Sequence, residues 1–130
     1  MSRTGKLYFK LHKGAIKTEQ ILSFLRHLLR HTTRPIVIVW DNVGPHKAKA
    51  VREFIAREKR LEVHYLPPYC PEFNPDEWFW ARLKGHELVG FAPDNVEELK
   101  RGIRLAVVRL RQKPSIIRSF YRASRLAEAA

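Results

Sequence analysis

The sequence predicts one folded domain of the α/β class. Segments with strand-like and helix-like patterns alternate along the 130 residues, and this order is typical of a layered α/β fold. A hydrophobic fraction of 45% is enough for one packed core, which argues against intrinsic disorder. The short β-branched run Ile36 to Trp40 is typical of a parallel strand that is covered on both faces.

The first half of the chain is predicted to form two strands and two helices. Residues 6–12 alternate between apolar and polar side chains, which is the period of a half-buried strand. Residues 18–33 carry apolar side chains at helical spacing, and Thr18 is the expected N-cap. After the strand Ile36 to Trp40, a turn over residues 41–45 leads into a second amphipathic helix.

The middle of the chain continues with a strand, a loop and an aromatic helix. Glu62 to Leu66 is predicted as a strand, and a proline-rich loop follows over residues 67–73. The pair Asn74-Pro75 supplies an N-cap and a first helical residue. We expect Trp78 and Trp80 to pack in the core under the sheet, with exposure of one of the pair as an alternative, since alternate helical positions diverge; exposed aromatic side chains can stack on nucleic-acid bases.

The last third of the chain is predicted to be helical. Asp94 is the expected start of a long amphipathic helix that ends before Pro114, and Ser115 to Leu126 form a final basic helix. We therefore expect residues 1–112 to form the main domain and residues 113–130 to form a basic C-terminal helix.

The charge predicts a polyanionic partner. The chain has 25 Lys and Arg against 13 Asp and Glu, so its formal net charge is +12. Both ends are basic: before Asp41 the single acid is Glu19, and after Leu99 it is Glu128. Phosphate polyanions are the commonest partners of such surfaces, while the alternative is a solubility device or a ribosome-like structural protein.

Two classes of protein are excluded by composition. The longest apolar run is far shorter than the roughly 20 residues that span a membrane, and no signal-peptide pattern opens the chain. The single cysteine, Cys70, excludes an internal disulfide and a Cys/His zinc module. We expect a soluble, cytoplasmic protein without a membrane partner.

Two acids in the central segment suggest a metal site. Asp41 follows a predicted strand, and Glu77 lies in the first turn of a predicted helix. Taken singly, Asp41 could be only a turn former and Glu77 only a partner of the helix dipole. Together, two carboxylates in a strongly basic protein suggest a site for Mg²⁺, a hard cation that prefers oxygen ligands and bridges to phosphate.

Two longer motifs surround these acids and carry a resemblance. Residues 39–47 and residues 66–78 resemble the second and third catalytic motifs of DDE transposases, and the closest type is the mariner-like family of bacterial insertion sequences. The resemblance covers roughly residues 6–90. It implies an RNase H-like fold with three α/β/α layers, and cutting and joining of DNA ends that depends on Mg²⁺ or Mn²⁺.

The resemblance also implies roles for individual residues. Asp41 matches the second metal-binding acid and Glu77 the third. Asn42 and His46 match residues that accompany the second acid, and Asn74 belongs to the third motif. Basic side chains near the motifs and in the later helices are expected to contact DNA phosphates: Lys47, Lys49, Arg82, Lys84, Arg101 and Arg104. The implied partners are transposon ends and target DNA, with a homodimer that brings both ends together in a nucleoid-associated location.

The sequence departs from the family pattern at three places. Cys70 replaces a usual Ser. Asp76 stands beside Glu77, and since neighbouring helical positions point about 100° apart, the motif register selects Glu77 as the metal ligand. The first catalytic Asp has no counterpart, because the only acid before Asp41 is Glu19, on a predicted helix.

The predicted strands show a corresponding gap. Residues 6–12 resemble the third strand of an RNase H-like sheet and Ile36 to Trp40 the fourth, so the first two strands and a helix-turn-helix region are missing. We therefore expect the C-terminal part of a split or truncated transposase, inactive or feeble alone, whose first acid comes from an upstream segment. The alternative is a non-catalytic basic nucleic-acid-binding remnant.

Overall fold

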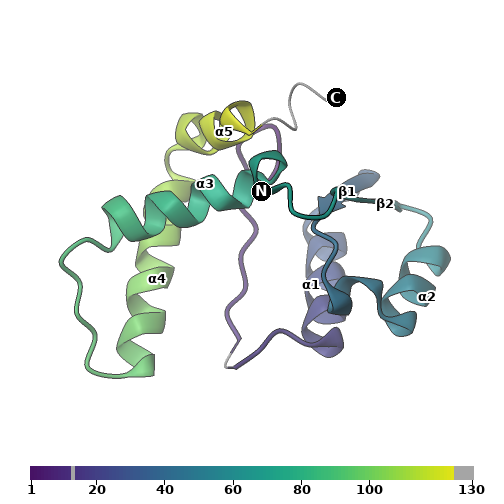
Figure 1. The fold of residues 1–130 in the computed structure, drawn as a ribbon, viewed down its shortest axis with the longest axis horizontal. Coiled ribbons are helices and arrows are strands. Elements are labelled where there is room, and N and C mark those ends of the chain that lie inside the picture. The colour runs from purple at the N-terminus through teal and green to yellow at the C-terminus, as the bar shows by residue number, and fades with distance from the viewer. Residues whose placement is uncertain (13, 125–130) are drawn as a thin grey trace. The chain divides into compact units, whose positions relative to one another are not determined.

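The computed structural model describes residues 1–12 and 14–124, which form two compact units (Figure 1). Unit 1 contains Met1–Phe9 and the described part of Pro71–Ala130, and unit 2 contains Lys10–Cys70. Each unit has its own hydrophobic core. Helices and a small parallel sheet occur together, in agreement with the α/β class. No helix of the described part is long and apolar enough to cross a membrane.

Unit 2 is a parallel strand pair with two helices. Strand β1 (Ile36–Trp40) has the predicted bounds and pairs with β2 (Leu61–Tyr65), which begins and ends one residue before the predicted strand Glu62 to Leu66. A parallel pair needs a crossover connection, which is supplied by a 3₁₀ turn (Gly44–Lys47) and helix α2 (Lys49–Arg57). Helix α1 (Thr18–His31) packs beside α2. The expected order of strand, turn, helix and strand is therefore confirmed.

The two helices cover one face of β1 only. Leu25 and Val51 are fully buried, and Ile38 packs against them. Val37 and Val39 point to the other face, where Val37 is 62% exposed. The expectation that both faces of this strand are covered is thus wrong within the described structure, because successive side chains alternate between faces and both helices lie on the same one.

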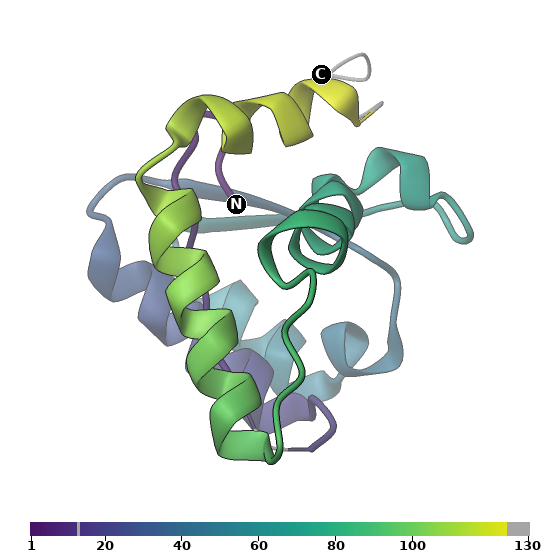
Figure 2. The ribbon, with the colours of Figure 1, turned by 90° about the vertical axis from the view of Figure 1, so that its left-hand side faces the viewer.

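Unit 1 is built from helices. Helix α3 (Pro75–Arg82) continues into a π-helical turn (Leu83–Glu87), and α4 (Val96–Arg111) and α5 (Pro114–Ala123) follow. Figures 1 and 2 show α3 running across α4. The most deeply buried large side chains of this core are Phe79, Leu83, Leu110 and Ile117. The predicted final helix begins one residue early, and its expected end at Leu126 lies outside the described residues.

The N-terminal segment differs from its prediction. Residues 6–12, all of which the structure describes, form no strand, so the predicted strand is wrong. The side chains of Leu7 and Phe9 do pack on the core of unit 1, which accounts for the apolar alternation. The backbone carbonyl of Leu7 accepts a hydrogen bond from Arg111 Nε at 2.9 Å. The alternation therefore reflects packing on helices. The Arg111 side chain supplies the Leu7 carbonyl with the hydrogen bond that a neighbouring strand would otherwise donate.

Two helices, α1 and α4, begin at an N-cap that differs from the predicted one by one residue. Lys17 is the N-cap of α1, so Thr18 is the first helical residue; the backbone N–H of Lys17 donates to Gln20 Oε1 at 3.0 Å. Asn95, rather than Asp94, caps α4. In each case the residue that caps is the one whose backbone or side chain reaches a partner three positions on.

The aromatic helix α3 buries a different ring from the two that were expected. Trp78 and Trp80 are both exposed, whereas Phe79 between them is buried. Phe79 lies on the face that meets α5, and its neighbours on either side turn away by about 100°. The expected core packing of the two tryptophans is therefore wrong.

Candidate functional site: a carboxylate at the end of β1

Asp41 lies directly after β1, at the carboxyl end of the parallel pair. Ligand-binding sites of α/β proteins lie at this end of the strands. Its side chain is half-exposed, but Oδ1 is buried and accepts no hydrogen bond from the described residues. The ring Nδ1 of His46 lies 2.8 Å from Oδ1. Buried carboxylate oxygens are normally satisfied by a donor or a cation, so this oxygen has capacity for one.

His46 is held close to Asp41 by three contacts. Its Nδ1 lies 3.0 Å from the backbone carbonyl oxygen of Asp41. Its ring stacks on the ring of Trp40, with centroids 4.2 Å apart and an interplanar angle of 5°. The hydroxyl of Tyr65 donates to the backbone carbonyl of His46 at 3.0 Å. The structure thus brings two motif residues together and adds Trp40 and Tyr65, which the sequence analysis missed.

A signal for these two aromatics is present in the strand pairing. Trp40 directly precedes Asp41, and Tyr65 is the partner of Trp40 in the parallel register of β1 and β2. The indole Nε1 of Trp40 is also buried without a hydrogen-bond partner among the described residues. A buried indole donor and a buried carboxylate acceptor without hydrogen bonds therefore occur side by side in the sequence at this strand end.

The remaining predicted residues of unit 2 lie on its surface. Asn42 and Lys47 are exposed. Lys49 is exposed too, and its Nζ lies 3.7 Å from Oε1 of Glu53, one helical turn further along α2. An exposed ion pair of this kind contributes little and leaves the ammonium accessible. Both lysines therefore remain available to a phosphate.

Glu77 lies in the first turn of α3, in unit 1. Asn74 caps this helix as predicted, because its Oδ1 accepts from the backbone N–H of Asp76 at 3.1 Å. The side chain of Glu77 is exposed and has no hydrogen bond or ion pair within the described part of the chain, whereas Asp76 Oδ1 lies 3.9 Å from the amino group of Met1. Glu77 is therefore the less engaged of the two adjacent carboxylates, and Asp41 belongs to the other unit.

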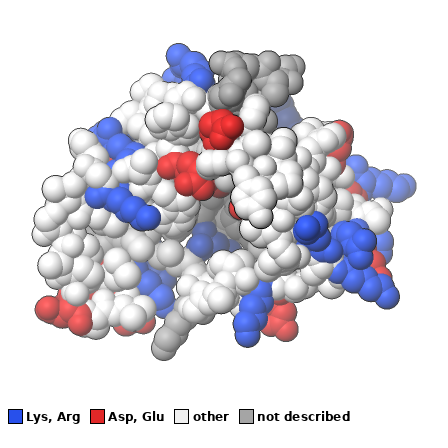
Figure 3. Space-filling model, viewed as in Figure 1, with Lys and Arg blue, Asp and Glu red and all other residues white. Residues whose placement is uncertain are grey.

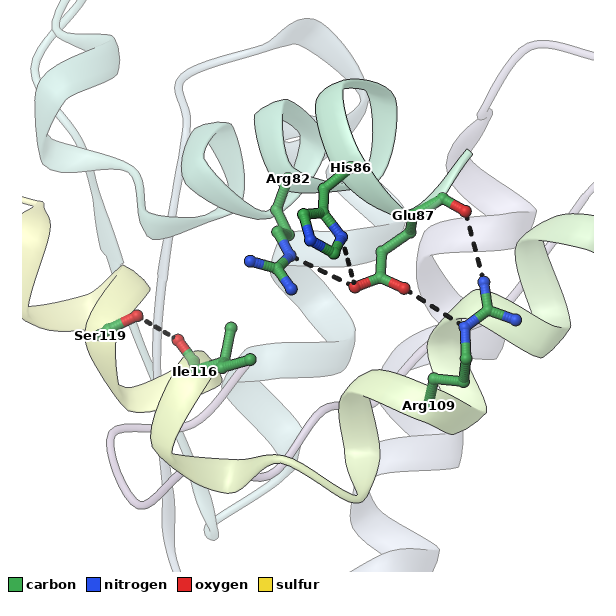
Figure 4. Close-up of polar contacts among 6 residues, drawn as sticks. All are labelled: Arg82, His86, Glu87, Arg109, Ile116 and Ser119. Atoms are coloured by element: carbon green, nitrogen blue, oxygen red, sulfur yellow. Dashed lines mark hydrogen bonds and ion pairs between the residues drawn. The ribbon is translucent and has the colours of Figure 1, made fainter. Parts of the chain in front are cut away.

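A buried carboxylate in unit 1 was not predicted. The side chain of Glu87 is 5% exposed and lies between Arg82 and Arg109, whose Nε atoms are 3.2 Å and 3.3 Å from its oxygens (Figure 4). His86 Nδ1 is 3.5 Å from the same carboxylate. Burial alone would raise the pKa of Glu87, but hydrogen bonds from Arg109 and Arg82 hold it below the ordinary value. His86 and Glu87 lie on the π-helical turn, while Arg82 ends α3 and Arg109 lies on α4.

This network changes the interpretation of the predicted DNA contacts in unit 1. The guanidinium of Arg82 donates a hydrogen bond to Glu87, which gives Arg82 a structural role. Its contact with DNA stays a prediction. Lys84, Arg101 and Arg104 are exposed and form no ion pair with any described residue. In the left half of Figure 3, where unit 1 lies as in Figure 1, the Lys and Arg side chains form separate groups with other residues between them.

The donor set of Asp41 fits a divalent cation in part. Carboxylate oxygens are the ligands that Mg²⁺ and Mn²⁺ prefer, and no described residue donates a hydrogen bond to Oδ1. Within residues 1–12 and 14–124, no three His, Cys, Asp or Glu side chains are grouped in a way that could hold a metal ion. The described residues thus supply one preformed oxygen and not a closed coordination shell.

Comparison with known proteins gives one result at the level of a family. No curated protein and no solved structure matches the chain significantly. A family model described as DDE superfamily endonuclease matches residues 1–100, which is well over half of the chain. The matched range includes Asp41, Asn42, His46 and Glu77, together with both motifs on which the resemblance depends. The chain therefore belongs to the DDE superfamily endonuclease family.

Proposed function

We propose that the chain takes part in transposase-type cleavage and transfer of DNA strands. Membership of the DDE superfamily endonucleases carries this proposal, because it identifies a nuclease domain of the transposase-like kind. The excess of positive charge, +12, supports DNA as the partner. The finer assignment to the mariner-like type rests on the two motifs at residues 39–47 and 66–78.

Asp41 and Glu77 are the proposed metal ligands. When bound, Mg²⁺ or Mn²⁺ activates the attacking oxygen and stabilises the leaving oxygen of a phosphodiester. Asp41 offers a buried oxygen that accepts no hydrogen bond from the described residues, at the end of a strand. Glu77 offers an exposed carboxylate on a helix whose first turn is fixed by the cap at Asn74. Exposed basic side chains such as Arg104 neutralise DNA phosphates.

The first catalytic acid is proposed to come from a segment outside these 130 residues, which would also complete an RNase H-like sheet. Before Asp41 the only acid is Glu19, and its side chain is exposed on α1. The described sheet has two strands, so β1 offers its second edge for pairing. An upstream transposase segment would supply both a strand and an acid. A homodimer and a nucleoid location belong to the same proposal.

A second candidate is a non-catalytic DNA-binding protein. It is favoured by one observation: the described residues group no three potential metal ligands. Both candidates predict salt-sensitive DNA binding, so that property does not separate them. Dependence of strand cleavage on metal and on the two carboxylates does.

The test is a cleavage assay in which the chain is supplied with the first strands of an intact relative. Strand cleavage of DNA is measured with Mg²⁺ or Mn²⁺ for the native chain, Asp41→Asn and Glu77→Gln. Cleavage that requires metal and is lost in both variants supports the proposal. Asp76→Asn is the matched control, because it removes the adjacent carboxylate of the same helical turn.

Three outcomes would contradict parts of the proposal. Cleavage that survives both substitutions would reject the two carboxylates as ligands. Loss in Asp76→Asn, with Glu77→Gln unaffected, would move the third ligand by one position. Binding of DNA without cleavage under any condition would favour the second candidate.

A further inference from the structure

We propose that His46 is a positioning residue that holds Asp41 in place at the end of β1. The inference rests on the proposed function, in which Asp41 is a metal ligand, and it assigns a role to a second residue of that site. The motif places His46 five residues after Asp41 but leaves its role open. The contacts in unit 2 supply that role.

One ring nitrogen contacts both the backbone and the side chain of Asp41. His46 Nδ1 lies 3.0 Å from the carbonyl oxygen and 2.8 Å from Oδ1 of that residue. Both oxygens can only accept, so Nδ1 carries a proton. The hydrogen bond goes to the carbonyl, and Oδ1 remains without one. The ring therefore fixes the residue, and Oδ1, which accepts no hydrogen bond from the described residues and has more than one lone pair, can still accept a cation.

His46 is itself fixed by the strand pair. Its ring stacks on the ring of Trp40, the last residue of β1, with the ring centroids 4.2 Å apart and an interplanar angle of 5°. Its backbone carbonyl accepts from the hydroxyl of Tyr65, the last residue of β2. Trp40 and Tyr65 are partners in the parallel register, so both anchors come from the same end of the same sheet. The imidazole thus has little freedom to rotate, which is what a group that orients a ligand requires.

A packing role and a positioning role predict different tolerance to substitution. An apolar residue such as Leu can cover the indole of Trp40 but has no donor for Asp41. Asn is smaller and stacks poorly, but its amide N–H can take the place of Nδ1–H. If His46 positions Asp41, Asn preserves the function of the site better than Leu does; if it only packs, the order is reversed.

The test uses the full chain, labelled for NMR at one fixed pH, with Mn²⁺ as the probe. Long-range ¹H–¹⁵N spectra identify which ring nitrogen of His46 carries the proton. Paramagnetic broadening of the Asp41 and Asn42 amide signals measures Mn²⁺ binding even when it is weak. The variants are His46→Asn, His46→Leu and His64→Leu, and thermal unfolding of each gives its stability. His64 is the matched control because it is an exposed histidine on β2 that contacts Glu62.

The expected result is a protonated Nδ1 and a Mn²⁺ affinity that falls about tenfold or more in His46→Leu. His46→Asn retains most of the affinity, and His64→Leu retains all of it. The stabilities of His46→Asn and His46→Leu need not follow this order. A bare Nδ1 in the native chain, or loss of Mn²⁺ affinity that is greater in His46→Asn than in His46→Leu, would overturn the positioning role.

A further variant separates this inference from the proposed function. If Asp41→Asn broadens with Mn²⁺ as the native chain does, or the native chain shows no broadening at Asp41, the metal assignment fails. The positioning role is then judged on the side-chain carboxyl ¹³C shift of Asp41. A shift that changes in His46→Leu, but not in His46→Asn or His64→Leu, supports it, and an unchanged shift in His46→Leu rejects it.

Discussion

Replacement of Glu87 by Gln is expected to destabilise unit 1 by about 2 kcal/mol. Gln has the same shape and keeps one acceptor, but its amide nitrogen faces a guanidinium. Hydrogen bonds to charged groups contribute about 1.5–3 kcal/mol each when buried. Arg82 is mostly buried, whereas Arg109 is 48% exposed and its contact is discounted toward the value of about 0.5–1 kcal/mol for surface pairs. The loss of the more buried contact, with Arg82, therefore accounts for most of the expected destabilisation.

The assay is urea unfolding at pH 7, combined with amide hydrogen exchange in α3 and α4. Exchange assigns the loss to unit 1, because the chain contains two compact units and one transition need not report both. Glu62→Gln is the control, since Glu62 is exposed and its carboxylate pairs with an exposed histidine, so its removal should cost under about 0.5 kcal/mol. Equal losses in the two variants would refute the reasoning.

The same network predicts a pH dependence of stability. The pKa of Glu87 is lower in the folded chain than its ordinary value of 4.5. A group with a lowered folded pKa contributes its stability fully above the unfolded pKa and loses it as pH falls through the folded pKa. The difference in unfolding free energy between the native chain and Glu87→Gln should therefore be constant near neutral pH and shrink below about pH 4.5. A difference that grows on acidification would contradict this assignment.

Three other substitutions, two of them with a matched control, test the packing and the charge. Leu110→Ala should cost about 2–5 kcal/mol in denaturant unfolding because Leu110 is fully buried, whereas exposed Leu105→Ala should be nearly neutral. Gly5→Ala should lower the melting temperature more than Gly90→Ala: both glycines have positive φ, but only at Gly5 would a new Cβ lie 2.6 Å from a backbone oxygen of α5. Arg104→Ala should weaken DNA binding and reduce the salt dependence of log K by about one unit of slope, measured by fluorescence anisotropy; an unchanged slope would remove Arg104 from the interface.

Local signals in the sequence predicted the elements that depend on local interactions. The β-branched run gave β1 with its bounds, and Asn74 with Pro75 gave the start of α3. The caps of α1 and α4 were predicted within one residue, which is the usual uncertainty of helix ends. These features are decided by neighbours within a few positions, so a single sequence contains enough information.

Features that depend on distant partners were missed. Residues 6–12 have the period of a strand, but a strand also needs a neighbouring strand, and Leu7 meets Arg111 instead. The contact of Glu87 with Arg109 joins positions 22 residues apart and has no local signature. For the candidate site, the motif identified Asp41 and His46, while the anchors Trp40 and Tyr65 became visible only through the register of the sheet.

The π-helical turn at Leu83–Glu87 makes unit 1 sensitive to chain length at this point. The backbone N–H of Leu88 reaches the carbonyl of Leu83, five residues back, so this turn contains one residue more than an ordinary helical turn. Deletion of one residue, such as Gly85, would leave an ordinary helical turn in which Leu88 still reaches the carbonyl of Leu83. Insertion of one residue beside Gly85 cannot be absorbed in this way: with the hydrogen bond to Leu83 kept, Glu87 would take the place of Leu88, which packs on the core, and His86 would take the place of the buried carboxylate. A single added codon is thus expected to disrupt the charge network around Glu87, whereas a single lost codon leaves the chain after Leu88 in place.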